Sequence, residues 1–279
     1  MALDGPKRTP SGVERYRIDA VDRALVLLDA IAALPGASAA QLAETLHLNR
    51  SLVFRLLATL SVRGFVVKDE NNRYQLGPRL LYLGQQAEQG SALIDASREV
   101  MNDLLEDTNE NVYLLVRDKL DVLCIATAFT GQAVRLSTDI GTRGGLHTGG
   151  AGKVMLAFAP PEVVEAVLQT QLDNFVPPSL RTRKQVLDVL TEIRKTGSYV
   201  AIGEIDPEIY SISAAIFYGH GAIAAALTIA GPVSRLPKSR EPELLTKVSN
   251  AAREISKRLG ASHPAPGMRD GRVDTAPPV

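Results

Sequence analysis

Residues 50–60 predict a helix whose two sides carry side chains of different chemistry. At about 100° per residue, the apolar side chains of this segment gather on one side. These are Leu52, Val53, Leu56, Leu57 and Leu60. The other side presents a hydroxyl, an aromatic ring, a guanidinium and a methyl group, from Ser51, Phe54, Arg55 and Ala58. Such a set suits base edges and phosphates in the major groove of DNA, and the alternative is a core helix with a solvated outer face.

The start of this helix and its charge favour a contact with nucleic acid. Asn49 is predicted to cap the helix, so Arg50 and Ser51 lie in its first turn, where backbone N–H groups can meet a phosphate. From Asn49 to Lys68 the chain has four basic residues and no acid, whereas the full chain balances 31 lysines and arginines against 31 acidic residues. We therefore expect a contact with nucleic acid through this segment, and not a protein that coats nucleic acid over its whole surface.

A second candidate site is the glycine-rich segment 141–152, which precedes a predicted helix at 153–159. Backbone N–H groups at such a helix start can hold a carboxylate or a phosphate. The segment does not match a P-loop, because His147 stands where the first glycine is required and Val154 where a serine or threonine must follow Lys153. Nucleotide hydrolysis is not expected, and the alternative to a ligand site is a plain strand-to-helix turn.

The other reactive side chains do not form a catalytic or metal-binding pattern. Cys124 is the single cysteine, so no internal disulfide can form, and its apolar neighbours predict a buried residue. The four histidines are scattered and no Gly-x-Ser-x-Gly motif is present, so we expect no enzyme activity, no metal and no cofactor. Residues 1–10 lack an apolar signal sequence, and the longest apolar stretch, 222–230, is too short to cross a bilayer. These features predict a cytoplasmic protein without membrane contact.

Residues 38–63 predict two short helices joined by a tight turn, the second of which is the two-sided helix. A hairpin after this helix would complete a winged helix-turn-helix. Gly64 is placed to end the helix, and extended runs at 65–68 and 74–76 flank a turn rich in asparagine and acidic residues. Asn72 and Arg73 are expected at the tip of this wing, within reach of a DNA backbone.

The core of this head needs a further helix and an apolar underside of the wing. Asp19 is predicted to cap a helix that ends near Pro35. Its apolar residues at helical spacing are Val21, Leu25, Leu28 and Ile31. Phe65 and Val67 are expected to pack beneath the wing.

The rest of the chain predicts a mixed sheet with helices around it. Further helices are expected at 78–90, 93–105, 161–169, 182–195 and 241–259. Strands are expected at 111–116, 121–127, 133–137, 199–204, 210–217 and 222–230, the last two paired across a glycine-containing turn.

Five separated segments resemble the isocitrate-lyase-regulator (IclR) type of bacterial transcription factor. They are residues 22–28, 48–60, 74–84, 146–158 and 225–232. The resemblance implies an α+β protein with an N-terminal winged helix-turn-helix, a linker helix and a C-terminal α/β effector-binding domain similar to GAF or PAS sensors. It also implies homodimers or dimers of dimers on double-stranded operator DNA.

The composition of the two chain ends predicts tails, and the resemblance predicts the domains between them, with the following boundaries. They are a disordered tail (1–17), the winged helix-turn-helix (18–78), the linker helix (79–92), the effector-binding domain (93–260) and a second disordered tail (261–279). The linker helix is expected to pack either on a symmetry mate or on its own domain.

Two sets of site residues follow. The predicted DNA contacts are Asn49, Arg50, Ser51, Phe54, Arg55, Thr59 and Arg73. The predicted effector contacts are Leu146, Gly149, Gly150, Ala151, Ser211, Ser213 and Thr228. Ser211 stands where the family often has a cysteine, and Glu204 or Asp206 would replace the family's acidic residues. The effector is therefore expected to be more apolar than the short keto acids that some relatives bind, or to be anchored differently. Ser211 and Ser213 could instead only satisfy the backbone or water.

These observations predict a ligand-responsive transcription regulator that controls a catabolic operon through a small organic acid or aromatic effector. The alternative is a small-molecule sensor that acts through a protein partner, with the N-terminal head as a dimerisation module. The basic run that ends at Lys68 favours DNA.

Overall fold

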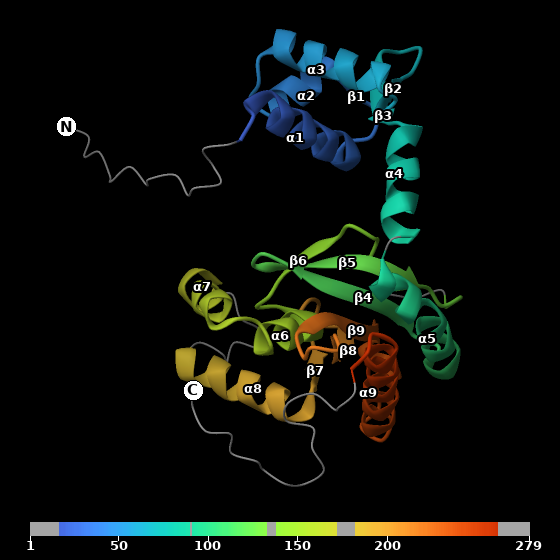
Figure 1. Cartoon of the computed structure of the whole chain (residues 1–279), viewed down its shortest axis with the longest axis vertical. Coiled ribbons are helices and arrows are strands. Elements are labelled where there is room, and N and C mark those ends of the chain that lie inside the picture. Colours follow the sequence, from blue (N-terminus) through green and yellow to red (C-terminus); the bar gives the residue numbers. More distant parts are fainter. Residues whose placement is uncertain (1–16, 90, 133–137, 172–181, 262–279) are drawn as a thin grey trace, which may run out of the picture. The chain divides into compact units, whose positions relative to one another are not determined.

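The computed structural model describes residues 17–89, 91–132, 138–171 and 182–261, and the chain divides into two units at Gly90/Ser91. Unit 1 contains three helices and a small sheet among these residues, followed by a further helix (Figure 1). Its elements are α1 (Asp19–Ala33), β1 (Ala37–Ser38), α2 (Ala39–Thr45), α3 (Arg50–Val62), β2 (Val66–Lys68), β3 (Arg73–Leu76) and α4 (Pro78–Gln89).

The apolar side of α3 forms the centre of the unit 1 core, as predicted. Val53, Leu56 and Leu57 are buried together with residues of α1, α2 and β3. The cap prediction is also confirmed, because the Asn49 side chain accepts a hydrogen bond of 2.8 Å from the backbone N–H of Ser51. A cap of this kind fixes where the helix begins, and therefore which residues lie in its first turn.

Two predictions for α1 are wrong. Ile18 is the N-cap, and Asp19 is already the first helical residue. Val21 and Leu25 are 54% and 57% exposed. The other two residues of the predicted set do reach the core, because Ile31 is buried together with Leu27 and Leu28 packs against them. An apolar helix offers more than one possible inner side, and the neighbouring α2, α3 and β3 decide which one is covered.

The wing is a sheet in the order β1-β3-β2, so a short strand before α2 adds to the expected hairpin. The prediction that Val67 packs beneath the wing is wrong by one residue. Val66 is buried on the same face as Tyr74, while Val67 and its cross-strand partner Gln75 face outward. Because side chains alternate along a strand, a shift of one residue exchanges the two faces.

Unit 2 is built on an antiparallel sheet whose described strands follow the order β6-β5-β4-β9-β8-β7. Its strands are β4 (Asn111–Asp118), β5 (Asp121–Ala128), β6 (Arg143–Gly145), β7 (Ser198–Ile202), β8 (Ile209–Phe217) and β9 (Ile223–Pro232). Its helices are α5 (Ala92–Thr108), α6 (Gly149–Ala157), α7 (Pro161–Gln171), α8 (Arg183–Thr196), a 3-10 turn (Val233–Arg235) and α9 (Glu241–Arg258). The expected strand at 133–137 lies outside the described residues. The helix expected from Lys153 begins at Gly149, inside the glycine run.

The two faces of this sheet carry separate apolar cores. Ile212 and Ile216 of β8 pack with α5 and α9, whereas Ala215 and Phe217 pack with α6, α7 and α8. Figure 1 shows these two groups of helices on opposite faces of the sheet. A winged helix-turn-helix unit followed by an α/β unit confirms the predicted fold class. In the described part of the chain, no helix is both long and apolar enough to cross a membrane.

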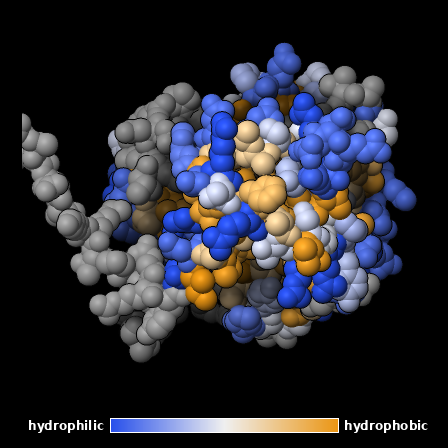
Figure 2. Space-filling view, turned by 90° about the horizontal axis from the view of Figure 1, so that it is seen from above, coloured by the Kyte–Doolittle hydropathy of each residue, from blue (hydrophilic) through white to orange (hydrophobic). Residues whose placement is uncertain are grey.

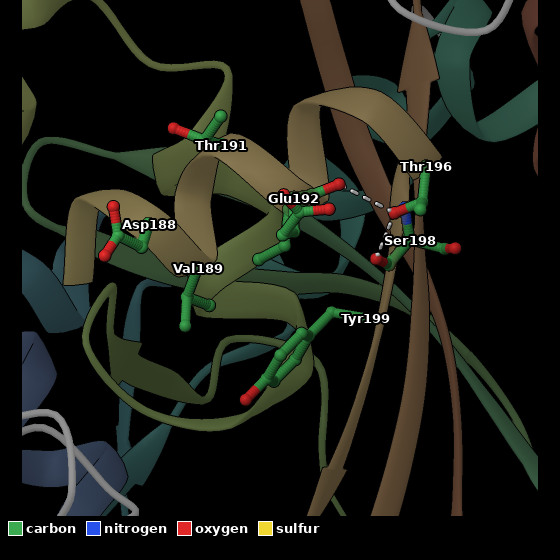
Figure 3. A pocket seen from close by; sticks show the side chains of 8 residues that line it. Asp188, Val189, Thr191, Glu192, Thr196, Ser198 and Tyr199 are labelled. Atoms are coloured by element: carbon green, nitrogen blue, oxygen red, sulfur yellow. Dashed lines mark hydrogen bonds between the residues drawn. The ribbon is translucent and has the colours of Figure 1, made fainter. Parts of the chain in front are cut away.

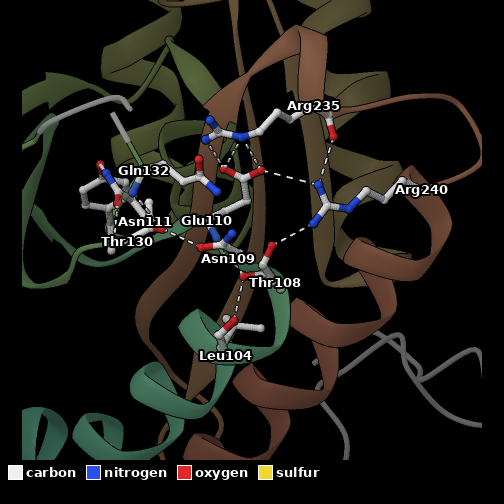
Figure 4. A network of polar contacts seen from close by, with 10 residues as sticks. Leu104, Thr108, Asn109, Glu110, Asn111, Thr130, Gln132, Arg235 and Arg240 are labelled. Carbon is white, nitrogen blue, oxygen red and sulfur yellow. Dashed lines mark hydrogen bonds and ion pairs between the residues drawn. The ribbon is translucent and has the colours of Figure 1, made fainter. Parts of the chain in front are cut away.

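A polar network ties the end of α5 to the connection between β9 and α9 (Figure 4). The buried Glu110 carboxylate accepts from the Arg235 guanidinium, with Nε 2.9 Å from Oε1, and Arg240 Nη1 lies 3.5 Å from the same oxygen. Arg240 Nη2 also donates to the Thr108 carbonyl at 2.7 Å. Buried carboxylates are stable only when paired, so this network fixes the α5 and α9 layer on its face of the sheet.

Candidate functional sites

The outer side of α3 collects six of the predicted DNA contacts on one surface. They are Asn49, Arg50, Ser51, Phe54, Arg55 and Thr59, all exposed. Phe54 is 62% exposed, which is unusual for an aromatic ring that a core could have covered. Apolar side chains lie among hydrophilic ones on the face of the protein that Figure 2 shows. Exposed apolar groups beside cationic ones suit base edges and phosphates together.

A groove of about 430 Å³ separates α3 from the wing. Phe54 and Ala58 of α3 line one side, and Val67 and Lys68 of β2 line the other. The outward position of Val67, which contradicted the sequence prediction, therefore gives this groove an apolar wall. Lys68 adds a cation at its edge.

Arg73 lies at the start of β3 rather than projecting freely from the wing tip. Its Nη1 donates to the Gly36 carbonyl at 2.9 Å, and its backbone N–H donates to the Asp69 carboxylate at 2.8 Å. Asp69 also accepts from the backbone N–H of Asn71, which closes the turn. The guanidinium thus has a structural contact, and a contact with DNA would use its other N–H groups.

In unit 2 the start of α6 packs directly on β8. The Gly150 N–H donates to Ser211 Oγ at 3.3 Å, and Ser213 Oγ lies 2.8 Å from Thr228 Oγ1. A Cβ atom on Gly150 would lie 2.6 Å from Ser213 Oγ, so a side chain here would force the Ser213 hydroxyl to move. The structure therefore brings together four of the predicted effector contacts.

The other predicted effector contacts differ in their surroundings. Gly149 has φ +64° and lies under Ile205, whose Cδ1 would be 2.9 Å from a Cβ atom there. Ala151 is buried one residue after Gly150. Leu146 is fully buried in the α6–α7–α8 core, which makes packing its first role.

Hydroxyl groups line one row across the sheet beneath α6. Ser213 pairs in register with Tyr199 of β7 and Thr228 of β9, and Thr228 pairs with Tyr113 of β4. Tyr113 is buried, its hydroxyl accepts from Asn111 Nδ2 at 3.0 Å, and burial raises the pKa of its phenol. Sequence reasoning missed Tyr113 and Asn111. Their signal was a polar residue at alternate positions of an otherwise apolar strand.

A buried ion pair, also missed, joins α6 to the segment between β7 and β8. Lys153 and Glu204 are ion-paired, and the Tyr199 hydroxyl donates to Glu204 Oε1 at 2.9 Å. Burial lowers the pKa of Lys153 despite the neighbouring carboxylate, and burial beside Glu204 raises the pKa of Tyr199. Of the two acids considered from the sequence, Glu204 is thus the inward one. Asp206 is exposed and accepts from the backbone N–H of Glu208.

Cys124 is fully buried, as predicted, in a small cluster with Tyr113 and Ala230. Burial raises the pKa of its thiol to about 11. Because the thiolate is the reactive form, burial and the raised pKa both lower the reactivity of this cysteine near neutral pH.

Comparison with protein families decides the identity. The model of the IclR helix-turn-helix domain matches residues 20–70, and that of the C-terminal domain of bacterial IclR transcriptional regulators matches residues 85–257. The chain belongs to the IclR family of bacterial transcriptional regulators. The regulator BhcR of Paracoccus denitrificans is 32% identical over 86% of each chain.

Solved IclR structures share the fold. The IclR regulator of Alicyclobacillus acidocaldarius has a TM-score of 0.80 at 23% identity, covering 88% of this chain and all of its own. An IclR homologue from Microbacterium hydrocarbonoxydans, solved with 4-hydroxybenzoate, has a TM-score of 0.76 at 23% identity, covering 87% of this chain and all of its own. The prediction of a transcription regulator is confirmed, and IclR regulators are not enzymes. The roles of individual residues stay predictions.

Proposed function

We propose that this IclR regulator binds double-stranded operator DNA through the outer side of α3 and releases or tightens that contact when unit 2 binds a small molecule. The observation that carries the DNA contact is the capped helix α3. Its leucine side is buried, while Phe54 and Arg55 stand exposed on the opposite side. A buried inner side leaves only the outer side for a groove of DNA.

The contacts follow from the chemistry of each side chain. Arg50 and Ser51 meet a phosphate or bases at the helix start, and Arg55 donates to bases or to the backbone. Phe54 contacts a thymine methyl group, and Ala58 lies beside it in the groove between α3 and the wing. Asn49, Thr59 and Arg73 support the contact from its edges.

The effector is proposed to be a small organic acid or an aromatic acid that signals to a catabolic operon. The row of hydroxyls beneath α6 supplies hydrogen-bond partners, and Leu146 and Ala151 supply apolar surroundings. The 4-hydroxybenzoate held by the Microbacterium homologue supports an aromatic acid as the first ligand to try.

Homodimers or dimers of dimers would couple the two events. Exposed apolar side chains on α1 and α4, among them Val21, Leu25 and Leu81, support an interface between copies of the chain. The coupling needs only an effector that binds one quaternary arrangement more tightly than another.

A gel-shift titration on the DNA upstream of the chain's own gene tests the proposal. Affinity should fall about 10³-fold or more between about 50 and 200 mM salt if six or more phosphates are neutralised. Saturable binding with a flat salt response, or none at all, would favour the alternative of a sensor with a protein partner. A thermal-shift screen of small carboxylates then searches for the effector, because any ligand of the folded state raises its stability.

A further inference from the structure

Lys153 and Glu204 are a charged pair that the contacts proposed above do not use. Their side chains are 1% and 3% exposed. Taking two such charges out of water is costly, and a hydrophobic pair of similar volume would often be as stable. A buried ion pair beside a ligand site therefore calls for a functional explanation.

The pair lies at the start of α6. Lys153 follows Gly149 by four residues, about one helical turn, so the two residues lie on the same side of the helix. Glu204 belongs to the segment 203–208 between β7 and β8, and the next residue, Ile205, contacts Gly149. Segment 203–208 thus makes two contacts with the start of α6. The Glu204 carboxylate pairs with the Lys153 ammonium, and the Ile205 side chain packs on Gly149.

A surface groove shares one residue, Tyr199, with the surroundings of this pair. It measures about 390 Å³ between α8 and β7, and Figure 3 shows the residues that line it, including Glu192, Ser198 and Tyr199. Tyr199 belongs to both places, because its side chain lines the groove and its hydroxyl donates to Glu204 Oε1. The Lys153 ammonium lies 5.2 Å from the centre of the same ring.

Charge balance limits how an anion can bind here. Lys153 and Glu204 together are neutral, so a carboxylate that joined them would leave two buried carboxylates with one ammonium. Like charges in a desolvated site repel strongly. A carboxylate that replaces Glu204 keeps the site neutral, retains the Tyr199 hydroxyl as donor and returns Glu204 to water.

We propose that the Lys153 ammonium binds the carboxylate of a monocarboxylic effector and that Glu204 occupies this position in the effector-free protein. Segment 203–208 moves outward when the effector carboxylate takes its place. The inference rests on the effector site proposed on this face of the sheet, and it names Lys153 as the residue that selects an anion.

The test measures binding of sodium acetate and sodium benzoate to the purified full-length chain by calorimetry. Glu204→Gln removes the competing charge at nearly constant shape, and Glu208→Gln is the matched control, because Glu208 is an exposed acid of the same segment. Glu204→Gln should bind one of the two anions at least about tenfold more tightly than wild type, since the buried ammonium lacks its counter-charge. Glu208→Gln should match wild type, and benzamide should gain nothing. Adding Lys153→Gln to Glu204→Gln should abolish the gain.

The proposal is overturned if Glu204→Gln binds neither anion more tightly than wild type, or if the double variant retains the gain. Failure of every protein to bind either anion overturns it as well. If Glu204→Gln does not fold, Glu204→Asp replaces it, and its weakened pair should give a smaller gain in the same order. DNA binding is measured separately by gel shift, so a protein that fails there refutes the proposed regulator while the anion titration still decides the role of Lys153.

Discussion

Arg55 and Lys153 carry the same charge in opposite surroundings. Arg55 is exposed on α3, in a run of basic residues without an acid, whereas Lys153 is buried on α6 against Glu204. An exposed cation keeps its hydration and contributes to a local field that a polyanion can meet. A buried cation has lost that hydration, so its partner decides whether the fold tolerates it.

The difference separates two kinds of candidate functional residue. Side chains on the outer side of α3 can be replaced with little loss of stability, so binding to a partner can determine which residues stand there. Side chains between α6 and the sheet stabilise the fold and also line the effector site that we propose. Substitutions in unit 1 should therefore change binding alone, and substitutions near α6 should change stability as well.

The strongest test of this contrast is Lys153→Met. It leaves the Glu204 carboxylate buried without its ammonium, which should lower the free energy of unfolding by about 3–5 kcal/mol. The control is Lys184→Met, because Lys184 and its partner Asp188 are exposed, and it should leave the free energy of unfolding nearly unchanged. Urea unfolding of both variants measures the two values. Equal effects would show that burial of the pair does not matter.

A smaller effect is expected from pH at the buried thiol. Burial raises the pKa of Cys124 to about 11, so between about pH 9 and 11 the folded protein holds a proton that the unfolded chain releases. Stability should fall as pH rises through this window, by about 2–3 kcal/mol. Cys124→Ala lacks this contribution, so the gap between the two unfolding curves isolates it. A constant gap from pH 8 to about 11 would mean that the thiol is accessible.

The same contrast explains what the sequence could predict. Asn49 as a cap and the leucine side of α3 are local features, and both are confirmed. The prediction that Val21 and Leu25 of α1 face the core is wrong, because the packing of neighbouring elements decides which side of this helix is buried. The Lys153–Glu204 pair spans 51 residues and depends on the path of segment 203–208, which no local periodicity encodes. The exposed surface of a helix can be predicted from local pattern, whereas a buried polar cluster depends on tertiary packing.

Gly150 tests how tightly the α6 site is packed. The Cβ atom of Gly150→Ala would lie 2.6 Å from Ser213 Oγ, which should cost about 1–3 kcal/mol of stability. Gly84→Ala on α4 is the matched control, since no atom lies within 4 Å of its Cβ position, and it should stabilise the helix by up to about 1 kcal/mol. A bulkier side chain at Gly150 should abolish the ligand response and spare DNA binding. A response that survives would place the effector elsewhere.

Arg55→Ala should change the stability of the protein least of all these variants, and its effect should be confined to DNA binding. Losing its contacts should weaken operator binding by about 1–3 kcal/mol, while the free energy of unfolding moves by less than about 0.5 kcal/mol. Arg253→Ala on α9 removes an exposed arginine of unit 2 and should leave DNA affinity unchanged. Gel shifts and urea unfolding on the same preparations measure both quantities. If Arg55→Ala bound DNA as wild type does while remaining folded, the outer side of α3 would not be the DNA contact. Arg55 would then be a solvated surface charge without a binding role, and it would differ from Lys153 only in its exposure to solvent.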